Sequence, residues 1–90
     1  MVSVGLPSML RGLAGGESHV ELSAATLGAA LDVLRERYPA LERRLRDEQG
    51  GLRRYVNFYV DGEECRRLAG PATPLRPDAE VVIIPSVAGG

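Results

Sequence analysis

The stretch "YVNFYVDGEEC", residues 55–65, contains the clearest strand of the chain, followed directly by a tight turn. Val56, Phe58 and Val60 alternate with Tyr55, Asn57 and Tyr59. This period of two is typical of a half-buried strand. The "DG" dipeptide that follows is a strong signal for a two-residue hairpin turn. We therefore expect a strand, a hairpin turn and a short return strand in this order.

The main helix is expected upstream of this strand, between Thr26 and Pro39. Thr26 is a good N-cap residue, and the helix should end before Pro39 because the residue preceding a proline avoids the helical conformation. Pro39 can also start a second short helical turn. The apolar side chains at helical spacing, which should face the sheet, are Leu27, Ala30, Leu31, Leu34 and Tyr38, followed by Leu41 and Leu45 in the second turn.

Three further strands are expected outside this central region. "MVSVGL" and "HVELS" near the start both alternate, and they could form an antiparallel pair across a long loop. "EVVIIP", residues 80–85, is apolar throughout, which indicates a strand covered on both faces or one with an adhesive outer face. The order of elements predicts a mixed α+β domain with one main helix packed on one sheet.

Length and composition bound the class of protein. Ninety residues make one domain, and 44% hydrophobic residues suffice for a modest core. The net charge is −1 with no basic face, which argues against a nucleic-acid partner. No apolar run is long enough to span a membrane, and no signal peptide is evident. A single cysteine rules out an internal disulfide and fits a reducing cytosol, so we expect a cytoplasmic protein.

The usual catalytic and metal-binding groupings are absent from the sequence. His19 is the one histidine, and we interpret it as a strand or loop residue without a chemical role. Cys65 has no second cysteine, and packing on a strand explains it better than reactivity does. The acidic residues around Asp61 are best explained by a solvated hairpin turn. We therefore expect no metal site and no catalytic centre.

The sequence closes on "VAGG", residues 87–90, directly after the last predicted strand. The other two Gly-Gly pairs lie between predicted elements, where turn geometry accounts for them. The bland interpretation of the last pair is a frayed terminus. An extended tail without side chains could instead enter a narrow channel and expose the carbonyl of Gly90 to a reagent from either side.

Across its whole length the sequence resembles the ubiquitin-like sulfur carriers of the MoaD/ThiS family. The residues that carry the resemblance are "TLGAAL", "YVNFYVDGEE", "EVVIIP" and "VAGG". The second and the last favour the CysO-type subgroup, which serves a cysteine synthase. The resemblance implies a β-grasp domain over residues 1–85 and a flexible C-terminal tail over residues 86–90. The family's usual turn before the last strand is altered here, and Asp78 is expected to keep it by adopting a left-handed conformation.

The resemblance also implies a function. An E1-like enzyme of the MoeB/ThiF/MoeZ type would adenylate Gly90 with ATP and magnesium, and sulfide or a persulfide would then leave a thiocarboxylate. That group would donate sulfur to a partner synthase, while a metallopeptidase is a further implied partner that releases the product. The chain would be a co-substrate that binds no cofactor and is not an enzyme. The tail residues entering partner active sites would be Val87, Ala88, Gly89 and Gly90.

Strand alternation predicts where partners dock. If Val81 and Ile83 point into the core, then Val82 and Ile84 point outward, and by the same count Tyr59 points outward on its own strand. The resemblance implies that the two strands lie close together, so Tyr59, Val82 and Ile84 would form one exposed patch. Exposed apolar patches on small domains often mark protein contacts, so we expect the activating enzyme and the synthase to share this patch.

Several functional readings remain open at this point. The sulfur acceptor could be cysteine, molybdopterin, thiazole or a secondary metabolite. The chain could also be the small subunit of molybdopterin synthase, a modifier joined to lysines of other proteins, or a plain β-grasp interaction module.

Overall fold

The structure, a computed structural model, describes residues 1–85 of the chain. Within them, the strands are β1 (Val2–Gly5), β2 (His19–Leu22), β3 (Val56–Val60), β4 (Glu63–Glu64) and β5 (Glu80–Pro85). The helices are α1 (Ser8–Arg11), α2 (Leu27–Arg37) and α3 (Pro39–Leu45). Short 3-10 turns are formed by Gly12–Ala14, Cys65–Arg67 and Gly70–Ala72.

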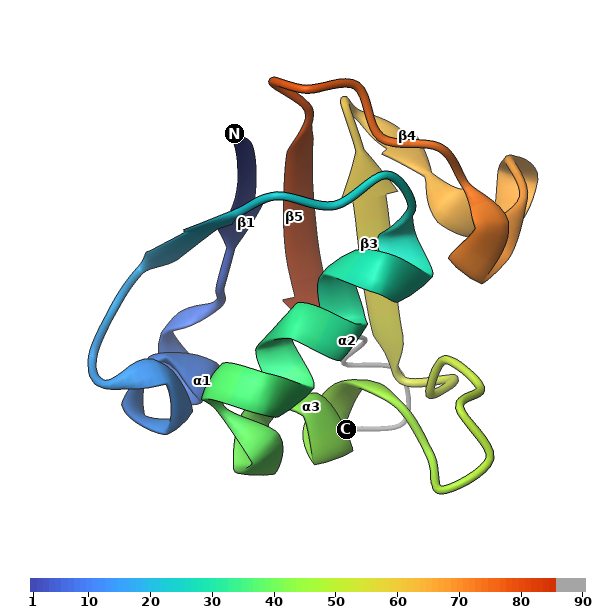
Figure 1. The fold of residues 1–90 in the computed structure, drawn as a ribbon. Coiled ribbons are helices and arrows are strands. Elements are labelled where there is room, and N and C mark those ends of the chain that lie inside the picture. Colours follow the sequence, from blue (N-terminus) through green and yellow to red (C-terminus); the bar gives the residue numbers. More distant parts are fainter. Residues whose placement is uncertain (86–90) are drawn as a thin grey trace.

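The strands form one mixed sheet in the order β2-β1-β5-β3-β4. β1 is antiparallel to β2 and parallel to β5, whereas β3 is antiparallel to both β5 and β4. α2 runs across one face of this sheet, in front of β5 and β3 in the view of Figure 1. The expected mixed sheet with one main helix packed across it is therefore confirmed, with β5 in the centre.

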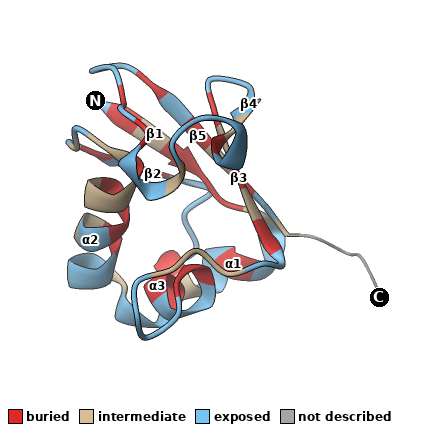
Figure 2. Cartoon of the chain, turned by 90° about the vertical axis from the view of Figure 1, so that its right-hand side faces the viewer, coloured by how far each residue is buried: buried red, intermediate tan, exposed pale blue. Residues whose placement is uncertain are grey.

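The core lies between α2 and the inner face of the sheet. Leu27, Leu31 and Leu34 of α2 are fully buried, as the helical spacing predicted. The sheet contributes buried side chains from β1, β2, β3 and β5 to the same cluster, among them Val4, Phe58, Val81 and Ile83. Figure 2 shows the buried side of α2 turned toward the interior of the domain and its exposed side turned away.

The ends of the helices follow their sequence signals. The Thr26 hydroxyl accepts a hydrogen bond from the Ala29 amide at 3.1 Å, which caps α2 and contributes about 1 kcal/mol. Tyr38 leaves the helical region with a φ of −138°, because it precedes a proline. Pro39 then begins α3, and both Leu41 and Leu45 are fully buried.

The hairpin between β3 and β4 turns where the sequence predicted. Asp61 and Gly62 have φ values of 49° and 89°, which fit a two-residue turn of the kind that matches strand twist. The Asp61 carboxylate also accepts a hydrogen bond from the Glu80 amide at 2.9 Å, so the turn is joined to the start of β5.

One turn prediction was wrong in detail. Asp61 is the one non-glycine residue with positive φ within residues 1–85, so Asp78 is not left-handed. The turn before β5 is nevertheless present, because the Ala79 amide donates to the Arg76 carbonyl at 3.0 Å. This closure therefore works without a left-handed residue at position 78.

The link between β1 and β2 is more ordered than the loop expected from the sequence. α1 and the 3-10 turn after it fill this link and bury Leu10 and Ala14 against the core. α1 is one helical turn with no side-chain cap at its start. Such a short segment has too few residues to show helical periodicity, so it was not predicted.

Candidate functional site

The candidate site begins where β5 ends, because the predicted tail continues from that point. β5 is paired with β1 over residues 80–82 and with β3 as far as its last residue, Pro85, which lies opposite Val56. The strand is thus a fixed base for whatever follows it. The tail residues named from the sequence, Val87, Ala88, Gly89 and Gly90, lie outside the described residues.

The three residues predicted to bind partners lie together on the outer face of the sheet. Tyr59 on β3 is paired directly with Val82 on β5, and Ile84 lies two residues further along β5. Ile84 is 45% exposed, while Tyr59 and Val82 are half-buried. The alternation on β5 is therefore as expected, and the outer side of this apolar strand is open. Partner binding through these residues remains a prediction.

A shallow groove beside this patch contains residues that sequence reasoning missed. It lies between the end of β1 and the end of β5, and Arg11, His19 and Ile84 are among its lining residues. Gly5 forms part of its floor, and a Cβ added there would lie 3.4 Å from His19 Nε2. His19 therefore covers the outer face next to Val82, although the sequence suggested no role for it.

Arg66 borders the same face on the side of β3. Its guanidinium donates to the Asn57 side-chain oxygen at 3.2 Å and to the backbone carbonyls of Arg53 and Val56 at 3.0 and 3.2 Å. β4 is too short to pair with this part of β3, so Arg66 satisfies the carbonyl of Val56 that no strand partner covers. The contact joins residues 9 to 13 positions apart and has no local sequence signal.

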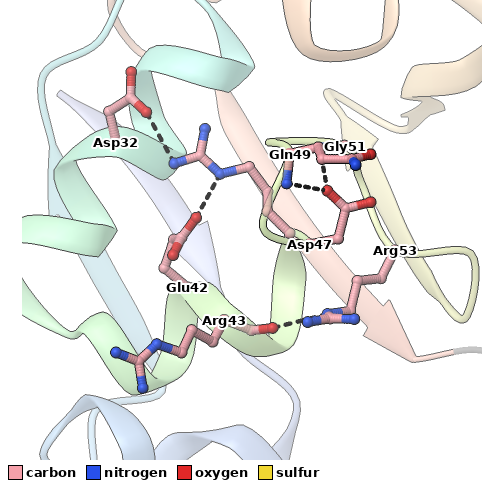
Figure 3. Close-up of polar contacts among 8 residues, drawn as sticks. Asp32, Glu42, Arg43, Asp47, Gln49, Gly51 and Arg53 are labelled. Carbon is pink, nitrogen blue, oxygen red and sulfur yellow. Dashed lines mark hydrogen bonds and ion pairs between the residues drawn. The ribbon is translucent and has the colours of Figure 1, made fainter.

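A polar network supports the loop that leads into β3 (Figure 3). Arg46 donates to Glu42 at 2.7 Å and to Asp32 at 2.8 Å, which joins α3 to α2. Burial alone would lower the pKa of Arg46, but the hydrogen bonds that its guanidinium donates to Asp32 and Glu42 outweigh this effect and leave the pKa raised. Arg53 extends the network by donating to the Arg43 carbonyl at 2.8 Å. These charged groups are used to hold the loop in place.

The Asp47 carboxylate closes the same loop from the inside. It accepts hydrogen bonds from the backbone amides of Gln49 and Gly51, both at 2.9 Å. The loop of residues 46–55 is consequently fixed at both ends and in the middle. The loop leads into Tyr55 and β3 at the end of the sheet where β5 ends, since Val56 lies opposite Pro85.

Cys65 is a packing residue, as the sequence interpretation favoured. Its side chain is fully buried within the core cluster. Burial raises the pKa of the Cys65 thiol above its ordinary value, and the neighbouring Glu64 carboxylate raises it further. A buried neutral thiol is a poor nucleophile.

Two features bear on the kind of site that residues 1–85 can hold. No cluster of three or more histidine, cysteine, aspartate or glutamate side chains there is arranged to hold a metal ion. None of the helices in this part of the chain has the length and apolar character needed to cross a membrane. The candidate site is the outer face together with the end of β5.

Comparisons with known proteins agree with this geometry. The sequence profile of the ThiS family matches residues 4–90. The Sulfur carrier protein CysO of Mycobacterium tuberculosis is 41% identical over 99% of this chain and 98% of its own length.

Two solved structures extend the likeness to the fold. The crystal structure of the Amycolatopsis orientalis BexX/CysO complex contains a chain with a TM-score of 0.92 and 34% identity, with full coverage of both chains. The small archaeal modifier protein 1 of Methanosarcina acetivorans has a TM-score of 0.84 and 33% identity, covering 99% of this chain and 95% of its own.

These matches cover the whole domain rather than one motif. The fold is the ubiquitin-like β-grasp of CysO and the archaeal modifiers, and the chain is a homologue of a sulfur carrier. The chain belongs to the ThiS family.

Proposed function

We propose that this chain carries sulfur as a thiocarboxylate on Gly90 and donates it to a partner synthase. An E1-like enzyme activates the carboxylate, and the acceptor belongs to cysteine biosynthesis or to another sulfur-containing metabolite. The observation that carries the proposal is the full-length likeness to Sulfur carrier protein CysO. The free thiol of Cys65 fits a reducing compartment, and we place the reaction in the cytoplasm.

The chemistry explains why a separate enzyme is needed. A carboxylate is a poor electrophile, so one of its oxygens first attacks the α-phosphate of ATP and releases pyrophosphate. The magnesium ion and cationic groups of the activating enzyme would stabilise the charge on the phosphates. Sulfide or an enzyme persulfide then attacks the acyl carbon and AMP leaves. Where a persulfide delivers the sulfur, a thiol must reduce the resulting disulfide.

The chain's own contribution is presentation of the reacting terminus. It supplies no general acid or base, and its polar network holds the loop beside β3 instead of a substrate. The outer face with Tyr59, Val82 and Ile84 serves as the surface by which partner enzymes grip the domain. β5 then sets the point from which residues 86–90 reach the partner's active site. A CysO crystallised in complex with BexX supports the idea that such carriers dock on other proteins.

A second candidate function follows from a different relative. The likeness to small archaeal modifier protein 1 supports a role as a modifier joined to lysines of other proteins. Both functions share the activated Gly90 carboxylate but differ in the acceptor. A modifier yields isopeptide-linked adducts in cells, whereas a carrier yields a free chain with a thiocarboxylate mass.

The loading experiment tests the proposal directly. The full chain is incubated with E1-like enzymes, ATP, magnesium and sulfide, and its intact mass is measured. The expected result is the mass gain for replacement of one oxygen by sulfur, and its loss when Gly90 is deleted. If the chain without Gly90 gains sulfur at the normal rate, the assignment of the loading site is wrong.

A substitution at Gly89 tests whether the width of the tail affects loading while the terminal carboxylate of Gly90 is kept. Gly89→Val should slow loading strongly, because a branched side chain restricts the backbone and widens the tail. Gly12→Val is the matched control, since Gly12 has an ordinary φ of −62° and open space around it. Equal loading rates for both variants would contradict the narrow-channel argument.

A further inference from the structure

The outer face of the sheet is graded in charge along the direction of β5. The register places Glu21 and Glu80 on either side of Ser3, at the start of β5. The next row across the face contains His19, Gly5, Val82, Tyr59 and Glu64, so its centre is apolar and its β4 edge carries one carboxylate. The row after that contains Ile84 and Asn57, at the end from which the tail departs.

Arginines flank this last row on both sides. Arg11 lines the groove with Ile84 and Pro85 on the β1 side, and its Nε donates to the Leu6 carbonyl at 3.1 Å. Arg66 lies on the β3 side, where it is bonded to Asn57. Arg11 forms no ion pair with any residue in the described part of the chain, and Arg66 has one long contact of 3.8 Å with Glu64. The tail end of the face is therefore positive mainly through Arg11, and Glu64 partly offsets the charge of Arg66.

The opposite end of the face is mainly negative. Two arginines also reach it: Arg37 donates to the Glu21 carbonyl at 2.9 Å, and Arg76 pairs at 3.3 Å with Asp61, which accepts from the Glu80 amide. Glu21 and Glu80 are both exposed, and neither has an ion-pair partner among residues 1–85. Four residues of strand separate Glu80 from Ile84, which corresponds to about 13 Å. This exceeds a Debye length of roughly 8 Å at physiological ionic strength, so a partner meets the two ends as separate charges.

An apolar patch alone can hold a partner on this face, but it does not determine how the partner is rotated about the patch. A partner rotated by half a turn on Tyr59, Val82 and Ile84 would still bury apolar surface, but its channel would lie away from the tail. Charges at the two ends remove this ambiguity, because the reversed orientation brings like charges together. Such charges also raise the rate of productive encounter at low salt.

We propose that Arg11 and Arg66 select the docking direction of the activating enzyme by pairing with acidic groups at the mouth of its tail channel. The enzyme surface that covers Glu21 and Glu80 is correspondingly neutral or basic. The inference rests on the proposed function, since it names the chemistry of the enzyme surface that meets the same site.

Charge variants at Arg11 test this inference against the E1-like enzyme that loads the unchanged chain with sulfur. Arg11→Glu reverses the charge beside Ile84, whereas Arg11→Lys keeps the charge and loses the Nε hydrogen bond. Arg44→Glu is the matched control, because Arg44 is exposed on α3 and its side chain has no hydrogen bond or ion pair within the described residues. Circular dichroism and urea unfolding check that each variant is folded.

The readout is the association rate constant at two ionic strengths, about 0.02 M and about 0.5 M, below and above the range where screening becomes strong. At low salt Arg11→Glu should associate at least about tenfold more slowly than the unchanged chain, and the difference should shrink at high salt. Arg11→Lys and Arg44→Glu should each stay within about twofold of the unchanged chain, because both keep the positive charge at the face.

Two outcomes overturn the inference, and they are distinguishable from each other. If the unchanged chain acquires no sulfur from any E1-like enzyme, the proposed function fails and the docking direction fails with it. If the unchanged chain loads normally but Arg11→Glu associates like Arg44→Glu, or Arg11→Lys is as slow as Arg11→Glu, only the charge-selected orientation is wrong.

Discussion

Replacement of Arg46 by methionine should be among the most destabilising single changes in the domain. The Arg46 side chain is 10% exposed and donates to Glu42, which is 12% exposed, and to Asp32, which is 67% exposed. Methionine keeps an unbranched apolar stem of similar reach, so the substitution removes the charge with little loss of packing. What remains is the Glu42 carboxylate, nearly buried and without its partner.

The magnitude follows from this asymmetry. Removal of one member of a buried ion pair typically costs about 3–5 kcal/mol, because the other charge stays desolvated. The free energy of unfolding of a small domain is about 5–15 kcal/mol, so Arg46→Met should remove a large share of it. Asp32→Asn should cost only about 0–1 kcal/mol, because the Asp32 side chain is mostly solvated and screened.

A double substitution separates the unpaired charge from the loss of shape. Glu42→Met together with Arg46→Met removes both charges and leaves apolar groups of similar length. Replacing a buried ion pair by apolar residues is often neutral or stabilising, so most of the loss should be recovered. Urea unfolding at neutral pH measures the unchanged chain, Glu42→Met, Arg46→Met and the double variant, and the coupling between Glu42 and Arg46 follows from this cycle.

The reasoning fails if Arg46→Met costs less than about 1 kcal/mol, since that is the range of an exposed ion pair. It also fails if the double variant is as unstable as Arg46→Met. The loss of stability would then come from altered packing and not from the unpaired charge of Glu42. Unchanged slopes of the unfolding curves would show that the comparison is between states of the same compactness.

Three other outcomes are expected. Leu31→Ala should cost about 2–5 kcal/mol because it opens a cavity between α2 and the sheet, and a loss below about half a kcal/mol would show that the packing face is misassigned. The free energy of unfolding should fall as pH rises above about 8.5, where the unfolded thiol ionises while buried Cys65 keeps its proton, and Cys65→Ala should flatten that decline. Ile84→Asp should leave the domain folded yet sharply weaken binding to the activating enzyme, whereas Leu68→Asp, at an equally exposed position of 45%, should bind normally. Equal loading by these two aspartate variants would move the docking surface elsewhere.

Most of the fold could be predicted because its main elements carry strong periodic signals. The stripe of α2 and the alternation of β3 each report burial within a few residues of sequence, and the ends of α2 carry a cap and a proline. α1 carries none of these signals, since one helical turn buries only Leu10. The turn at Asp61 was predicted correctly, but Asp78 does not adopt the left-handed conformation that was also expected of it. Asp61 and Asp78 are both suited to that conformation, and the hydrogen bonding around each decides which adopts it.

Only the apolar residues of the candidate site could be predicted from the sequence. Tyr59, Val82 and Ile84 follow from alternation on two strands, and the antiparallel register then places them side by side. Arg11, His19 and Arg66 reach the same face through contacts between elements distant in the sequence. Alternation assigns a side chain to a face, but it does not say which side chains of other strands lie next to it.

The central position of β5 is what joins the docking face and the tail into one site. β1 and β3 hold β5 along both edges, and the Asp61 carboxylate holds its start. An enzyme that grips Ile84 therefore also fixes Pro85, and the five residues after it can extend at most about 17 Å. If the chain docks and is loaded as proposed, the partner's active site lies within that radius of the patch and on its positive side. The orientation of the domain would then set the position of the Gly90 carboxylate, and this gives the charges around Ile84 a role beside the apolar contact.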